Sequence, residues 1–308
     1  METITVEDIV RRFSLEILAG KEHLRRTVEK AGLHHPGLEF INHFDFLPAG
    51  HIQVLGKNEG AYLQRLDGEE RRLRIENVLT YNPPCVIVTD NQEGLVYLTE
   101  ICETKGIPLL RTSKSTYELM GKLDAYLVKQ LAPEMAVHGV CVNVSGIGIL
   151  LRGKSGVGKS ETAHTLLGRG HRLIADDIVV LKKLSPQTLL GTHNETNKEF
   201  LALRSVGLLN VVRLYGRKAF QEETRITLDI ELTKWKDNML NNELEIETKH
   251  KEYMGVRIPH MQIQLQPGRD VAGLIEAAAN NWYLQQQGYN AAEEFMKRVE
   301  SDLSSHNE

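Results

Sequence analysis

The residue pattern with the clearest chemistry is one octapeptide, Gly153, Lys154, Ser155, Gly156, Val157, Gly158, Lys159 and Ser160. It has the form G-x-x-x-x-G-K-[ST], which is typical of a phosphate-binding loop. Its glycines let successive backbone N–H groups turn inward around phosphate oxygens. The lysine would reach the outer phosphates, and the final serine hydroxyl would ligate magnesium. The pattern therefore predicts a site for ATP and Mg²⁺, with a glycine-rich turn that binds no nucleotide as the alternative.

The flanking residues place this loop between a strand and a helix. Residues 140–144 and 147–151 are mostly apolar and strand-like, and residues 160–167 have a helix-like composition. The start of a helix carries a partial positive charge, which favours an anion bound beside it. The strand–loop–helix order therefore supports nucleotide binding.

Two adjacent carboxylates, Asp176 and Asp177, end an apolar, strand-like run about 17 residues beyond Lys159. In a site of phosphoryl transfer, one carboxylate can hold the metal and the other can accept the proton of the attacking hydroxyl. Because two neighbouring carboxylates resist double ionisation, we expect the pKa of one of them to be raised. The alternative is an ordinary turn at the end of a strand, where paired aspartates are common.

His138 stands directly before the run that leads into the phosphate-binding loop. This places it at the start of that strand, at the end opposite the loop. It would meet the two aspartates only if the sheet were strongly twisted or the strand formed a hairpin. The residues alone therefore favour a core histidine whose nitrogens are satisfied internally.

The length of 308 residues suits two domains. The alternation of strand-like and helix-like segments breaks at residues 131–134, which places the predicted domains at residues 1–131 and 132–308. The apolar fraction of 41% and the charged fraction of 25% are those of an ordinary soluble globular protein. The net charge of −4 offers no basic surface, so we expect no nucleic-acid partner.

The spacing of the cysteines and the composition of the first residues indicate in which cellular compartment the protein acts. Cys85, Cys102 and Cys141 are far apart, and no pair has the spacing of metal ligands. The acidic, polar residues 1–8 do not have the form of a signal peptide. No apolar run approaches the roughly 20 residues that cross a membrane. We therefore expect a reduced, cytoplasmic protein without a membrane segment.

The first domain alternates strand-like and helix-like segments, which predicts a parallel sheet covered by helices. Helices are expected at residues 6–13, 93–105 and 115–130. Strands are expected at residues 51–56, 85–89 and 107–111.

The second domain is expected to continue beyond the loop with further strands and two helices. Residues 185–200 are polar and predict a mobile loop. Strand-rich sections are expected over residues 208–233 and 258–265. A helix with Asp270 as its N-cap should stop at Gly288, before a last helix from about residue 291.

Beyond the phosphate-binding loop, several further runs of residues are typical of one protein family. In the second domain they are residues 138–140, 146–150, 161–163 and 169–177 around the loop. Elsewhere they are residues 36–39, 52–56 followed by Glu59, 131–133 and 267–269. Over nearly its whole length the chain resembles bacterial HPr kinase/phosphorylase. The loop is shared with many families, whereas the block from His138 to Asp177 is specific to this one.

The resemblance implies an α/β fold, in which an N-terminal α/β domain precedes a P-loop nucleotide-binding domain similar to phosphoenolpyruvate carboxykinase. It implies a kinase that uses ATP and Mg²⁺ to phosphorylate a serine of HPr, the phosphocarrier of the sugar phosphotransferase system, and so regulates carbon metabolism. The same enzyme would remove that phosphate with inorganic phosphate and release pyrophosphate. The family is hexameric, which implies a homohexamer.

The resemblance also implies roles for single residues. By matching positions, Lys159 would hold the outer phosphates and Ser160 the magnesium. Asp177 would be the general base toward the serine and the acid in the reverse direction, with assistance from His138. The region tied to the phosphorylase reaction matches Gln264, Leu265, Gln266, Pro267, Gly268 and Arg269.

Three positions depart from the family pattern. Ala202 stands where the family has a magnesium-binding glutamate, and Glu243, counted without gaps from Trp235, stands where it has a catalytic arginine. The segment 264–266 lacks the family's proline and basic residue. A carboxylate that binds the metal or an arginine that binds the transferred phosphate typically contributes a factor of about 10²–10⁵ to the rate. Asp176 could replace the metal ligand, and the candidates for the missing cation are Arg204, Arg213, Arg217 and Arg257.

Three functions stay open at this point. The first is a working HPr kinase/phosphorylase. The second is a regulatory protein that binds nucleotide and HPr but turns over weakly, which Ala202 and Glu243 favour. The third is a phosphotransferase that acts on a different hydroxyl, because a fold does not fix its substrate.

Overall fold

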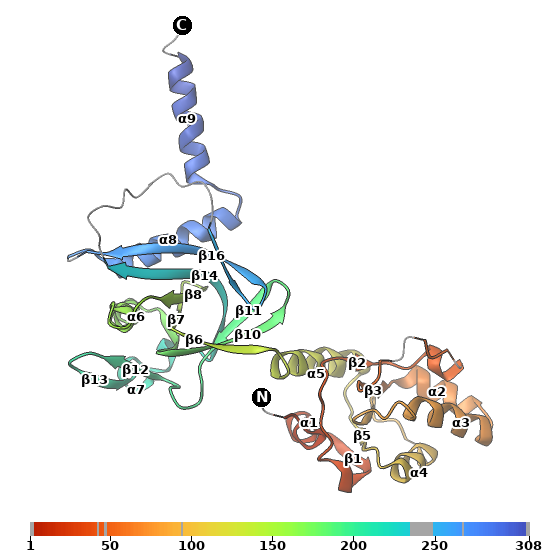
Figure 1. Cartoon of the computed structure of the whole chain (residues 1–308). Coiled ribbons are helices and arrows are strands. Elements are labelled where there is room, and N and C mark those ends of the chain that lie inside the picture. The colour runs from red at the N-terminus through yellow and green to blue at the C-terminus, as the bar shows by residue number, and fades with distance from the viewer. Residues whose placement is uncertain are drawn as a thin grey trace. The chain divides into compact units, whose positions relative to one another are not determined.

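The structure, a computed structural model, describes residues 3–41, 43–45, 48–93, 95–234, 249–266 and 268–305 (Figure 1). The chain divides into two compact units, Met1–Ala132 and Pro133–Glu308. Within the described ranges, no helix is both long and apolar enough to cross a membrane.

The first unit is built on a five-stranded sheet with the order β1-β5-β4-β3-β2. Its strands are β1 (Glu16–Ala19), β2 (Leu33–His34), β3 (Ile52–Leu55), β4 (Val86–Val88) and β5 (Leu109–Arg111). The strands β2 to β5 run parallel, as the sequence predicts, and β1 joins the β5 edge antiparallel. Every residue of β3 and β4 is buried, because helices cover both faces of the sheet.

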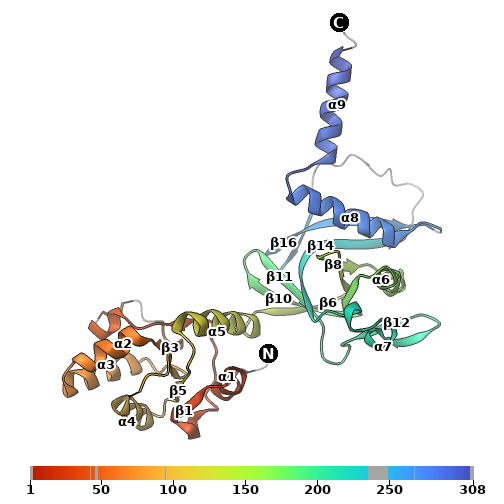
Figure 2. The same cartoon turned by 180° about the vertical axis from the view of Figure 1, so that it is seen from behind.

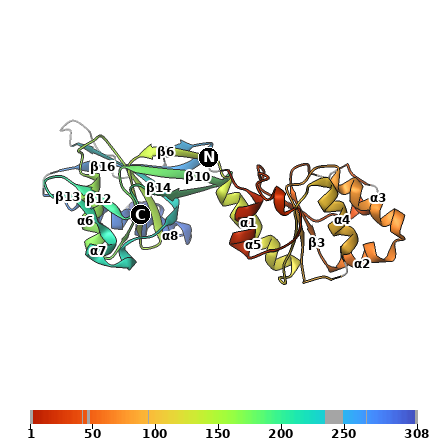
Figure 3. The same ribbon diagram turned by 90° about the horizontal axis from the view of Figure 1, so that it is seen from below.

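Those helices form a layer on each side of the sheet (Figure 3). One layer contains α1 (Val6–Phe13) and α5 (Thr116–Gln130), and the other contains α2 (Lys57–Arg65), α3 (Gly68–Leu79) and α4 (Val96–Lys105). Two 3-10 turns, η1 (Lys21–His23) and η2 (Leu38–Ile41), complete the unit. In α5, Leu119, Leu123 and Leu127 recur at every fourth position and are fully buried.

The second unit is built on a larger, mixed sheet with the order β6-β10-β11-β14-β8-β7-β9. These strands are β6 (Glu134–His138), β7 (Val140–Val144), β8 (Ile147–Arg152), β9 (Arg172–Ala175), β10 (Ile178–Ser185), β11 (Thr188–Thr192) and β14 (Glu223–Lys234). The hairpin of β15 (His250–Tyr253) and β16 (Val256–Leu265) adds to β14 through β16. A separate pair consists of β12 (Phe200–Leu203) and β13 (Gly207–Asn210).

The helices of this unit are α6 (Lys159–Gly168), α7 (Val211–Tyr215), α8 (Val271–Gln286) and α9 (Ala291–Ser305), with the 3-10 turn η3 (Arg217–Ala219). Helices α6 and α8 lie beside each other against the sheet formed by β7, β8 and β14 (Figure 2). Leu166 of α6 and Ile275 of α8 are fully buried in this core. The core fixes the start of α6, and with it the end of the phosphate-binding loop.

The predicted N-cap and stop of α8 are confirmed. The side chain of Asp270 accepts a hydrogen bond of 3.0 Å from the backbone N of Gly273. The helix ends before Gly288, which adopts a positive φ of 84° that favours glycine.

The predicted mobile loop at residues 185–200 is wrong over its first part, whereas residues 193–199 contain no helix or strand. All of β11 lies in that first part, and its Leu189 and Leu190 are buried between β10 and β14. The polar neighbours of this five-residue strand conceal it, because its burial comes from pairing with distant segments. The expected strand section 208–233 is also interrupted, since Asn210 caps the short helix α7.

The buried carboxylate of Asp229 connects β14 to side chains of three other strands, β8, β15 and β16. It is completely buried and accepts two bonds of 2.6 Å from Arg152 at the end of β8. It also accepts bonds from Tyr253 Oη at 2.5 Å and His260 Nδ1 at 2.7 Å. Burial alone would raise the pKa of Asp229, but these donors outweigh it and hold the pKa below its usual value.

We expect Asp229→Ala to lower the free energy of unfolding by about 3–5 kcal/mol, because it leaves the largely buried Arg152 guanidinium with only a 4.0 Å contact to Glu231. Urea unfolding of the whole chain measures this change. The matched control is Glu195→Ala, an exposed carboxylate of the same unit, whose effect should stay within about 0.5 kcal/mol. Equal stability of the two variants would contradict this role of Asp229.

Candidate active site

The phosphate-binding loop lies between β8 and α6, as its sequence predicts. Gly153, Gly156 and Gly158 adopt positive φ angles of 143°, 74° and 105°. A side chain at Gly153 would collide with the carbonyl oxygen of Leu232 in β14. Gly158 serves as the N-cap of α6, so the backbone N–H groups at the start of this helix face the loop. The loop can therefore surround a phosphate group as closely as the motif requires.

The side chain of Lys159 is buried against the loop itself. Lys159 is only 7% exposed, and its Nζ donates hydrogen bonds to the carbonyl oxygens of Gly153 at 3.0 Å and Lys154 at 3.4 Å. These weak, neutral acceptors hold the ammonium at the loop without neutralising its charge. The charge is therefore available to an anion that enters the loop.

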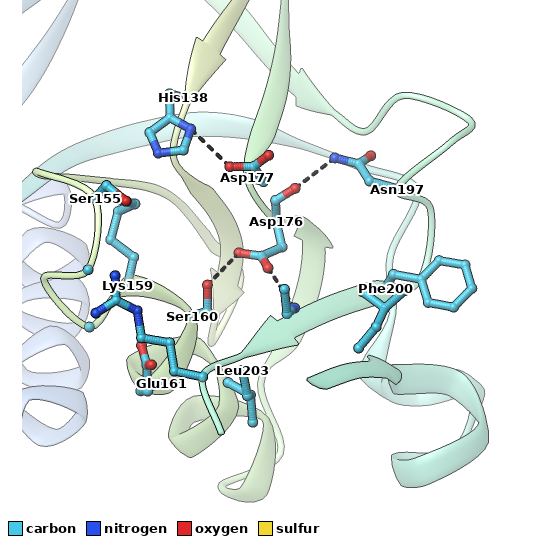
Figure 4. Close-up of a pocket in the computed structure, with 15 residues that line it drawn as sticks. His138, Ser155, Lys159, Ser160, Glu161, Asp176, Asp177, Asn197, Phe200 and Leu203 are labelled. Atoms are coloured by element: carbon cyan, nitrogen blue, oxygen red, sulfur yellow. Dashed lines mark hydrogen bonds and ion pairs between the residues drawn. The ribbon is translucent and has the colours of Figure 1, made fainter. Parts of the chain in front are cut away.

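Asp176 connects the first turn of α6 to β12. Its Oδ1 accepts a 2.9 Å bond from Ser160 Oγ, and its Oδ2 accepts a 2.9 Å bond from the backbone N of Ala202 (Figure 4). Burial raises the pKa of Asp176, and these bonds offset only part of the rise. One aspartate of the pair thus has a raised pKa as expected, but the charge of Asp177 is the smallest cause rather than the main one.

We expect Asp176→Asn to raise the free energy of unfolding at neutral pH by about 0.5–2 kcal/mol, because it removes a buried charge. Two hydrogen bonds remain possible, since the amide oxygen can accept from the Ala202 N–H and the amide NH₂ can donate to Ser160 Oγ. A carboxyl group whose pKa is higher in the folded protein than in the unfolded chain lowers the free energy of unfolding at pH values above the unfolded pKa. The difference from the wild type should therefore shrink as pH falls toward about 4. Urea unfolding over a pH series measures it, and a variant less stable than the wild type at neutral pH would contradict the prediction.

The prediction of a core histidine at position 138 is wrong. The His138 side chain is 56% exposed, and its Nδ1 lies 3.0 Å from Asp177 Oδ1 (Figure 4). Residue 138 ends β6, which is a separate strand from β7, and the chain turns at Gly139. Strand β6 pairs antiparallel with β10 so that His138 lies opposite Ile178, next to Asp177. The pair therefore depends on strand pairing that the local sequence does not reveal.

A pocket of about 460 Å³ brings these groups together. His138 and Asp177 line it together with Gly156, Lys159 and Ser160 of the loop. Figure 4 shows the His138–Asp177 pair across the pocket from Lys159 and Ser160. The pocket is also lined by four residues to which the sequence assigns no role in the site: Asn197, Phe200, Leu203 and Leu208. The arrangement places a phosphate-binding loop opposite an exposed carboxylate–histidine pair, which suits transfer of a phosphoryl group to a hydroxyl.

Asn197 is a site residue that sequence reasoning missed. Its Nδ2 donates to the backbone oxygens of Asp176 at 2.7 Å and Ile178 at 3.1 Å. These bonds hold the turn in which Asp177 adopts a positive φ of 69°, a conformation that costs energy for an aspartate. No motif or spacing marks this residue, because its role follows only from the fold.

The donor set near the loop fits a magnesium ion bound mainly by phosphates and water. The described residues contain no group of three or more His, Cys, Asp or Glu side chains that could hold a metal. Ser160 Oγ and the Asp176 carboxylate are adjacent, and Mg²⁺ often takes one or two protein ligands beside phosphate oxygens. Ala202 contributes a backbone N–H here and no ligand, as its residue type requires.

The other predicted residues lie at the edge of this site or outside the described residues. Leu265 ends β16, and its Cδ1 would be 3.9 Å from a side chain at Gly158, so this strand reaches the loop. Gln264, Gln266, Gly268 and Arg269 do not line the pocket. Trp235, Glu243 and Pro267 lie outside the described residues.

Comparison with known proteins gives consistent matches over both units. The family model described as HPr Serine kinase N terminus matches residues 4–127, and that described as HPr Serine kinase C-terminal domain matches residues 129–299. A "Putative HPr kinase/phosphorylase 2" of Oceanobacillus iheyensis is 65% identical over 300 residues, which cover 97% of this chain and 98% of the relative. An HPr kinase/phosphorylase of Bacillus cytotoxicus is 37% identical over 308 residues, 100% of both chains. The solved HPr(Ser) kinase/phosphatase from Coxiella burnetii is 27% identical, covers 52% of this chain and 98% of that chain, and superposes with a TM-score of 0.47.

Proposed function

Because the chain belongs to the HPr kinase/phosphorylase family, we propose that it transfers the outer phosphoryl group of ATP to a serine of HPr. The observation that carries this proposal is the pocket in which the His138–Asp177 pair faces the phosphate-binding loop. In that pocket a hydroxyl between Asp177 and a phosphate in the loop would meet both a base and an electrophile.

Each residue of the pocket has a defined task in this transfer. The amides of residues 153–160 and the Lys159 ammonium bind and orient the phosphates of ATP. The exposed Asp177 carboxylate accepts the proton of the serine hydroxyl as that oxygen attacks. His138 holds the carboxylate in position through its 3.0 Å contact. A magnesium ion held by Ser160 and Asp176 would supply charge that neutralises the phosphate oxygens.

The reverse reaction uses the same groups in the opposite sense. Asp177, once protonated, returns its proton to the serine oxygen as the phosphoryl group leaves for inorganic phosphate in the loop, and pyrophosphate forms. The segment 264–269 begins at the end of β16, where Leu265 reaches the loop, which supports its assignment to this direction. A homohexameric assembly and action in the cytoplasm belong to the same proposal, by analogy with the family.

The direct test is transfer of label from ATP to HPr. The purified chain is incubated with Mg²⁺, ATP labelled at its outer phosphate, and HPr, and the acceptor control is HPr with its target serine replaced by alanine. We expect label on HPr and none on the control protein. Label on both proteins, or only on another protein in a cell extract, would contradict the proposed acceptor.

A second candidate is a regulatory protein that binds ATP and HPr with little turnover. Ala202 favours it, because the side chain at this position cannot bind a metal. Under this alternative an ATP titration shows normal binding, yet HPr acquires no label over many hours.

A further inference from the structure

Arg204 places a cation at the mouth of the phosphate-binding loop. It follows β12 in the turn to β13, and it lines the same pocket as Lys159 and Asp177. A methyl group built on Gly156 would lie 2.6 Å from the Arg204 Cζ, so the guanidinium rests directly against the loop backbone. Among the described residues, no hydrogen bond or ion pair engages its side chain. The guanidinium is thus held at the loop with its donors uncommitted.

The other arginines that could supply a cation are placed differently. Arg217 pairs with Glu199 at 3.2 Å and with Glu222 at 2.9 Å, which neutralise it. Arg213 and Arg257 are exposed and do not line the pocket. Of the four candidates from the sequence, Arg204 alone combines contact with the loop and an unneutralised charge.

The charges around the loop explain what such a cation would do. The pocket contains the carboxylates of Glu161, Asp176 and Asp177, which repel the phosphates of ATP. At position 202 an alanine adds no further negative charge, and two residues later Arg204 adds a positive one. A guanidinium can bind two phosphate oxygens at once with parallel N–H donors.

We propose that Arg204 is a phosphate-binding cation of the nucleotide site, and that it makes ATP binding largely independent of divalent metal. This inference rests on the proposed function, since it assumes that ATP occupies the loop. The guanidinium grips the outer phosphates from the side of the β12–β13 turn, while Lys159 and the loop amides hold them from the side of α6. The charge that a metal otherwise supplies for binding is then already present in the protein.

The test measures ATP affinity by equilibrium titration, once with Mg²⁺ and once with EDTA. We expect the wild type to bind ATP in EDTA within about tenfold of its affinity in Mg²⁺. Arg204→Gln should weaken binding in EDTA by about 10- to 100-fold, the usual effect of losing charged hydrogen bonds. Arg204→Lys should restore part of the affinity, because it keeps the charge without the paired donors. Arg213→Gln, the matched control at an exposed arginine outside the pocket, should bind as the wild type does.

The outcomes separate this inference from the proposed function. If the wild type binds ATP but Arg204→Gln binds equally well in EDTA, the inference is overturned and the proposed function stands. Loss of binding on chelation in the wild type overturns it as well. If the wild type binds no ATP in either buffer, the proposed function itself fails, and this inference fails with it. A thermal melt of each variant confirms that the exposed substitutions leave the fold intact.

Discussion

Asp177→Asn is expected to slow phosphoryl transfer to HPr by about 10²–10⁴, the usual contribution of a general base. The amide cannot accept the proton of the serine hydroxyl, but it has nearly the same size and keeps a contact with His138. Asp177 is also exposed and separated from the groups that bind the phosphates, so the affinity for ATP should change less than threefold. Initial rates with labelled ATP, together with ATP titration, separate the two effects.

The control for this prediction is Asp124→Asn, an exposed aspartate of α5 in the other unit. Its transfer rate should equal that of the wild type. His138→Ala should slow transfer less than Asp177→Asn, because it removes the residue that positions the base but leaves the base itself. A transfer rate for Asp177→Asn within threefold of the wild type would exclude the aspartate as the base.

Lys159→Ala is expected to abolish both ATP binding and transfer at ordinary ATP concentrations, a loss of about 10²-fold or more in affinity. The substitution removes the buried ammonium that points at the phosphates. It also leaves the carbonyl oxygens of Gly153 and Lys154 without their donor, which disturbs the loop itself. ATP titration in Mg²⁺ measures the change.

The control is Lys218→Ala, an exposed lysine in η3 that does not line the pocket. It should bind and transfer as the wild type does. If Lys159→Ala retained wild-type affinity for ATP, the phosphates would have to bind elsewhere, and the assignment of the loop would be wrong.

The sequence predicts the parts of this site that depend on neighbouring residues. The loop, the start of α6 and the turn with Asp176 and Asp177 are each encoded within a few residues, so motif and periodicity suffice to locate them. The same holds for the cap at Asp270 and the stop at Gly288.

The parts that the residues alone do not reveal depend on contacts between distant segments. His138 meets Asp177 only because β6 ends at Gly139 and pairs with β10 rather than continuing into β7. Asn197 reaches the pocket from residues 185–200, whose polar composition predicts a loop, and Arg204 reaches it from the turn that follows β12. Resemblance to the family corrects the expectation for His138, because a family motif carries the result of such contacts without deriving them.

The most direct measurement is the crystal structure of the chain with HPr and a nonhydrolysable ATP analogue in Mg²⁺. We expect the triphosphate to lie in the loop of residues 153–160 and the acceptor serine oxygen to lie between the outer phosphate and Asp177. An analogue bound outside this loop, or a serine oxygen that approaches the phosphate from a side remote from Asp177, would contradict it.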